Sequence, residues 1–110
     1  MDRDALIVQV RGMIAQNPVD VTFTPTGGTA QTIEGGEANI TISERQLNVG
    51  AQVSYLRFVW CIVDDWTTAP AKRDVLTVDG TEYRILDIKR YYMGAAVRYD
   101  LGAKYEMRRD

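Results

Sequence analysis

The sequence predicts a mainly β protein, a small antiparallel β-barrel or sandwich of five or six strands with one α-helix at the N-terminus. Three observations lead to this prediction. Residues 97–107 alternate between apolar and polar side chains, which is the period of a half-buried strand. Two short apolar runs meet at Asp79-Gly80, and this pair favours a tight hairpin turn because both residues tolerate positive φ. The strand patterns follow one another without intervening helices, so no parallel βαβ unit is expected.

The composition narrows the possible functions. The 110 residues fit a single domain. The net charge is −2, and neither half of the chain is strongly basic, whereas nucleic-acid-binding proteins usually have a strongly basic region. Cys61 is the only cysteine and histidine is absent, so an intramolecular disulfide, a histidine-based triad and a histidine metal site are excluded. We therefore expect no enzymatic activity, no metal and no cofactor. The N-terminus lacks the pattern of a secretory signal and no apolar run reaches the ~18 residues of a membrane span, so we expect a cytoplasmic protein.

The N-terminal helix is expected within residues 1–17. Apolar side chains recur at helical spacing, an aspartate precedes them as a candidate cap, and Asn17-Pro18 ends the pattern. Gly12 weakens the helix, which therefore depends on packing against a sheet or another subunit. Residues 19–23 alternate and predict the first strand, which ends at Pro25.

Residues 24–39 predict a mobile glycine-rich loop. The segment holds four glycines, and its only large apolar residue is Ile33, so it lacks the apolar surface that would offset the entropy of ordering it. The glycine pairs lack the following lysine and the spacing of a phosphate-binding loop. We interpret the segment as part of a candidate assembly interface that comprises Gly27, Gly28, Thr29, Ile33, Gly35, Gly36 and, from a later loop, Trp66.

The middle of the chain predicts a strand around Ile40 and Ile42 and a longer strand over residues 52–63. The longer strand is apolar on both faces, which indicates burial either under the helix and the sheet or against a neighbouring subunit. Cys61 is expected to be a small core residue. Asp64 and Asp65 point to opposite faces of an extended chain and predict a solvated turn rather than an acid–base pair.

Trp66 leaves two interpretations open, a cap over the barrel mouth or an anchor in an interface. The sequence favours neither.

The C-terminal hairpin and long strand are expected over residues 74–107, with Asp79 and Gly80 as the structural turn. The apolar side chains change face between residues 85 and 86, which predicts a β-bulge or a strand covered on both faces. Further along, basic and aromatic side chains cluster once, as a nucleic-acid surface requires, although a solvated turn is the simpler interpretation. These candidate DNA-facing residues are Lys89, Arg90, Tyr91 and Tyr92.

The same segment resembles a known family. The chain reads Asp-Val-Leu-Thr-Val-Asp-Gly over residues 74–80, followed after two residues by Tyr83-Arg84-Ile85 and then by Ile88, with Pro70 a few residues ahead. This pattern resembles the head–tail joining proteins of tailed bacteriophages, also called neck or head-completion proteins. The resemblance covers about the last 40 residues.

The resemblance implies a structural virion subunit that joins the portal side of the phage head to the tail, assembles as a ring and helps to retain packaged DNA. Its implied partners are copies of itself and the portal or connector and tail proteins, with DNA only as channel content and no membrane. The implied location is the host cytoplasm during assembly and then the virion neck, and a monomer is expected in dilute solution. The alternatives are a small β-barrel adaptor or ligand-binding protein of a bacterial host, a tail-terminator-like ring protein, and an enzyme with a carboxylate or tyrosine site.

Overall fold

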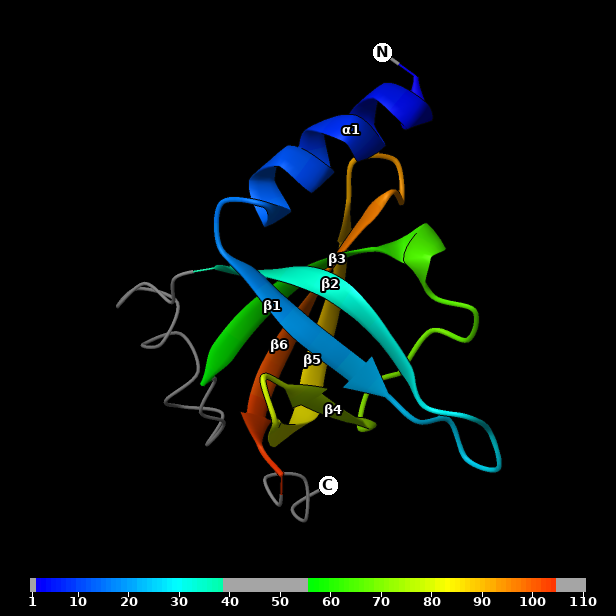
Figure 1. Cartoon of the computed structure of the whole chain (residues 1–110), viewed down its shortest axis with the longest axis vertical. Coiled ribbons are helices and arrows are strands. Elements are labelled where there is room, and N and C mark those ends of the chain that lie inside the picture. The colour runs from blue at the N-terminus through cyan, green and yellow to red at the C-terminus, as the bar shows by residue number, and fades with distance from the viewer. Residues whose placement is uncertain (1, 39–55, 105–110) are drawn as a thin grey trace.

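A computed structural model of the chain describes residues 2–38 and 56–104 (Figure 1). Within these ranges, six antiparallel strands close into a barrel in the order β1-β2-β3-β6-β5-β4, and one helix packs outside it. The predicted mainly β barrel with an N-terminal helix is confirmed. The elements are α1 (Arg3–Ile14), β1 (Pro18–Phe23), β2 (Gln31–Ala38), β3 (Arg57–Ile62), the short 3₁₀ turn η1 (Val63–Asp65), β4 (Val75–Val78), β5 (Thr81–Tyr91) and β6 (Ala96–Ala103).

Alternating strands fill the barrel interior with apolar side chains. Along β1, Val19, Val21 and Phe23 point inward, whereas Asp20 is exposed and Thr22 is partly exposed. Successive side chains of a strand point to opposite faces. Strands β1, β3, β4, β5 and β6 therefore place buried side chains in this core, and Ile33 of β2 packs against it. The buried core comprises Val19, Val21, Phe23, Val59, Cys61, Trp66, Leu76, Val78, Ile85, Val97, Tyr99 and Leu101.

A second, smaller core joins α1 to the outside of the barrel. Val10 and Ile14 of the helix pack on Ile62 and Ala96, which lie on β3 and β6. Asp2 caps the helix as predicted, since its side chain accepts a hydrogen bond from the Ala5 N–H. The helix lies at one end of the barrel beside the β5–β6 turn (Figure 1).

The apolar strand predicted over residues 52–63 is seen as β3, and residues 52–55 lie outside the described ranges. Val59 and Cys61 face the barrel core, while Ile62 faces the helix on the opposite side. Burial under the helix and the sheet therefore accounts for both apolar faces at this end of β3. The prediction that Cys61 is a core residue is confirmed.

The prediction of a mobile loop over residues 24–39 is wrong for residues 31–38, because these residues form β2. This strand pairs with β1 from Gln31 to Gly36 and with β3 from Gly36 to Ala38. Its glycines are explained by close packing rather than by mobility. A Cβ on Gly35 would lie 2.8 Å from a methyl group of Val21, and a Cβ on Gly36 would lie 2.8 Å from the Ile14 Cα.

The hairpin predicted at Asp79-Gly80 is confirmed. Strands β4 and β5 pair up to Val78 and Thr81, and the two turn residues have φ of 49° and 86°. Positive φ at both central positions is the conformation that matches the twist of the flanking strands. The predicted bulge is also confirmed, because the register of β5 against β6 shifts between Ile85 and Asp87.

Some predictions fall on residues that the structure does not describe. These are the strand around Ile40 and Ile42, and the C-terminal part of the long strand beyond residue 104. The described part of that strand is β6, which ends at Ala103.

Candidate functional site

The described residues contain no cluster of three or more His, Cys, Asp or Glu side chains that would hold a metal ion. Burial raises the pKa of the Cys61 thiol well above its ordinary value, so this thiol stays protonated and unreactive at neutral pH. No helix in the described ranges is long and apolar enough to cross a membrane. The surface turns and cavities of the described residues therefore remain as candidate sites.

The structure separates the residues of the candidate assembly interface. Gly27, Gly28 and Thr29 are exposed on the turn between β1 and β2, where Gly27 has φ of 74° and the Gly28 N–H donates to the Pro25 carbonyl oxygen at 2.9 Å. The other members from this segment lie in β2. Ile33 is partly buried against the core, and Gly35 and Gly36 are buried. Only the turn residues of this set are fully available to a partner.

Trp66 belongs to the barrel core. Its side chain is 7% exposed and meets Phe23 edge to face with ring centroids 6.2 Å apart, so it caps the barrel interior, as one of the two interpretations predicted. Its indole N–H has no hydrogen-bond partner among the described residues. Burial raises the pKa of Tyr99, which leaves the phenol neutral inside the barrel.

The four candidate DNA-facing residues do not all point to solvent. Lys89 and Arg90 are exposed near the end of β5, whereas Tyr91 is partly buried and its ring centroid lies 4.8 Å from that of Trp60. Tyr92 is 42% exposed and begins the β5–β6 turn. A role for these residues in contacting DNA stays a prediction.

The alternation over residues 97–107 predicted a half-buried strand with its polar side chains in solvent, and this is wrong at Asp100, whose side chain is fully buried. Arg98 donates to its two carboxylate oxygens at 2.7 and 3.1 Å, and the Lys89 Nζ lies 3.8 Å away. Burial nevertheless raises the pKa of Asp100, against the opposing effect of Arg98. The Arg98 guanidinium also lies over the Phe58 ring, 4.3 Å from its centroid. The outer face of β6 is thus a second packed layer at this position.

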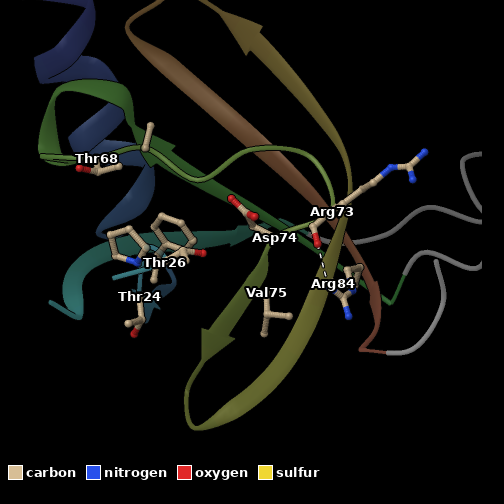
Figure 2. Close-up of a pocket in the computed structure, with 10 residues that line it drawn as sticks. Thr24, Thr26, Thr68, Arg73, Asp74, Val75 and Arg84 are labelled. Carbon is tan, nitrogen blue, oxygen red and sulfur yellow. Dashed lines mark hydrogen bonds between the residues drawn. The ribbon is translucent and has the colours of Figure 1, made fainter. Parts of the chain in front are cut away.

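The barrel is open at one end of its β1–β4 seam. These two strands pair only at Val21 with Val78 and at Thr22 with Thr77. Beyond this point Thr24 and Val75 line a cavity of about 410 Å³, which we call the seam cavity. Figure 2 shows it between the threonines of the β1 side and the first residues of β4. Its lining residues are Phe23, Thr24, Pro25, Thr26, Thr68, Ala69, Arg73, Asp74, Val75 and Arg84.

The charged side chains around the seam cavity already have protein partners. The Arg84 guanidinium donates to the carbonyl oxygens of Arg73 and Lys104 at 2.7 and 2.9 Å. The Asp74 carboxylate accepts from the Ala71 N–H at 2.8 Å. In Figure 2 the Arg73 side chain extends away from the threonines. The Asp74 carboxylate nevertheless lines the cavity and points toward its threonine side in Figure 2.

The fold and this opening define a small closed β-barrel protein with one incomplete seam. No family model, curated protein or solved structure matches the chain. Sequence reasoning missed the seam cavity, because pairing between β1 and β4 joins segments more than 50 residues apart and leaves no local signal of where it ends.

Proposed function

We propose that the protein is a structural subunit of a tailed bacteriophage neck, which assembles as a ring and joins the head to the tail. The observation that carries the proposal is the placement of the segment that resembles this family. Its residues 74–80 and 83–85 build the β4–β5 hairpin, with the Asp-Gly pair in the positive-φ turn. The Asp-Gly pair of this segment thus has a defined structural role in the turn, which is compatible with the proposal.

The β1–β2 turn supports the same proposal. It extends from the barrel (Figure 1) and consists of small, exposed residues around Gly27. A ring is built from a head-to-tail contact in which one patch of each subunit meets a different patch of the next. A turn that extends from a rigid barrel supplies one such patch without disturbing the core.

The experiment is gene deletion and complementation in the phage or prophage that encodes the protein. We expect the deletion to yield heads and free tails that do not join, and the wild-type protein to restore infectious particles. Normal particle yields without the gene would overturn the proposal.

Variants of the turn test whether it takes part. Thr26→Lys with Thr29→Lys adds two charges at exposed positions, so we expect joining to fail while the thermal unfolding of the purified protein is nearly unchanged. Thr26→Ser with Thr29→Ser is the matched control and should complement normally. Equal complementation by the two double variants would show that the turn is not part of the interface. The gene deletion would then be the test of the neck function.

A further inference from the structure

The direction of the backbone groups at the seam follows from the hydrogen bonds of the neighbouring residues. In β4 the Asp74 carbonyl oxygen accepts from the Ile85 N–H on the β5 side, whereas the Asp79 N–H donates to the Asp20 carbonyl oxygen on the β1 side. Because these directions alternate along a strand, the N–H and C=O of Val75 point to the β1 side. By the same alternation, those of Thr24 point to the β4 side.

Thr24 and Val75 would be the next hydrogen-bonded pair of the seam, but the ladder ends at Thr22 and Thr77. Two donors and two acceptors of the backbone therefore face the seam cavity from opposite walls without ladder partners. Unpaired strand edges of this kind are templates for pairing with another extended chain.

The size of the cavity suits a short piece of strand. With a rise of about 3.3 Å per residue, a strand spacing of about 4.8 Å and a sheet separation of about 10 Å, one residue of strand occupies roughly 160 Å³. The cavity of about 410 Å³ therefore has room for between two and three residues.

The chemistry of the lining favours a neutral peptide over an anion. The Arg84 guanidinium donates to two backbone carbonyl oxygens, whereas the Asp74 carboxylate lines the cavity together with Thr24, Thr26 and Thr68. A carboxylate in the wall repels an anion. A phosphate or a free carboxylate would need a cation directed at it, whereas an extended peptide needs donors and acceptors at strand spacing.

We propose that the seam cavity binds a short extended segment of a partner protein, which pairs with Thr24 on one side and with Val75 on the other. Two or three of its residues enter the seam, main-chain hydrogen bonds supply most of the affinity, and small or β-branched side chains fit beside the threonines. This binding site goes beyond the proposed neck function and does not depend on it.

The probe is the synthetic peptide acetyl-Thr-Val-Thr-Val-Lys-amide, titrated into the full ¹⁵N-labelled chain. We expect amide shift changes centred on Thr24, Thr26 and Val75, and at least tenfold weaker binding when the two valine nitrogens of the peptide are methylated. Absence of amide shift changes at peptide concentrations up to about 5 mM, where even very weak binding is detected, would overturn the proposal. So would equal binding of the methylated peptide, or equal shifts with inorganic phosphate.

Variants of Val75 test the backbone directly. Val75→Pro removes the N–H that faces the seam, at the first residue of β4, where proline is tolerated and the β5 ladder loses no bond. We expect at least fivefold weaker peptide binding, whereas Val75→Thr keeps the N–H and should bind as wild type. Unchanged peptide binding by a folded Val75→Pro protein would contradict the pairing. If that variant does not fold, the affinity of the N-methylated peptide for the wild-type protein tests the same hydrogen bonds.

Discussion

Two glycines show how the same residue type has opposite effects on stability in this chain. Gly80 has φ of 86° in the β4–β5 turn, a conformation that costs other residues free energy, whereas Gly12 lies in α1 with ordinary helical backbone. Neither position is crowded, since a Cβ at either would meet no atom within 4 Å. Backbone conformation alone therefore separates them.

We predict that Gly80→Ala destabilises the protein by about 1–2 kcal/mol, because the new Cβ is strained at positive φ. Gly12→Ala is the matched control and should stabilise it by up to about 1 kcal/mol, because alanine favours the helix. Chemical denaturation of both variants measures the two changes. Equal shifts of the two midpoints in the same direction would contradict the tight turn.

Helix α1 is attached to the barrel by charge pairs as well as by its apolar face. Arg3 binds both carboxylate oxygens of Asp64, and Arg11 binds both of Asp65. Adjacent aspartates on η1 thus receive two arginines from the same helix. The prediction of a solvated turn is correct for Asp64, whose side chain is 52% exposed. The prediction did not include the arginine that binds each of the two carboxylates.

The Arg3 hydrogen bonds lower the pKa of the Asp64 carboxyl below its usual range. A carboxyl whose pKa is lower in the folded state stabilises the fold at pH above about 4, and this contribution is lost as the pH falls through the folded-state value. We predict that Arg3→Gln raises the midpoint of the Asp64 titration toward the ordinary value, as measured by carbon NMR of the carboxyl group.

Arg11→Gln is the control for this titration, because Arg11 binds the other aspartate. Its effect on the Asp64 midpoint should be small. Equal displacement of the midpoint by both variants would mean that general charge near the helix, rather than the Arg3 contact, sets the Asp64 pKa.

Closure of the whole barrel depends on two short seams. Within the described residues, strands β2 and β3 share three paired positions, and β1 and β4 share two. Beside the first seam, the Gln31 side chain substitutes for missing strand pairing, since it donates to the Asp65 carbonyl oxygen and accepts from the Thr67 N–H. Strand β2 is therefore tied to the rest of the molecule along both of its edges.

We predict that deleting residues 28–37 abolishes cooperative unfolding, because the deletion removes β2 from a closed barrel. A mobile loop, as the composition had indicated, would tolerate the same deletion. Inserting Ser-Gly-Ser between Gly27 and Gly28 is the control, since it lengthens only the exposed turn and should leave the midpoint nearly unchanged. Thermal circular dichroism distinguishes the two, and a cooperative transition in the deletion variant would contradict this role of β2.

Local signals in the sequence determined the elements whose physics is local. The apolar spacing and the Asp2 cap predicted α1, alternation predicted β1 and β6, and the Asp79-Gly80 pair predicted the β4–β5 turn, because helix and hairpin geometry depend on neighbouring residues.

Only the tertiary structure decided where distant segments meet. Gly35 and Gly36 appeared as loop residues because composition does not show that Ile14 and Val21 would approach them. Asp100 appeared exposed because its burial comes from packing, although its partner Arg98 is only two residues away on the same strand. The sequence likewise contains no local signal of where the pairing between β1 and β4 ends. Strand pairing over long sequence separations is fixed by the packing of the whole barrel, and the seam cavity lies where that pairing ends.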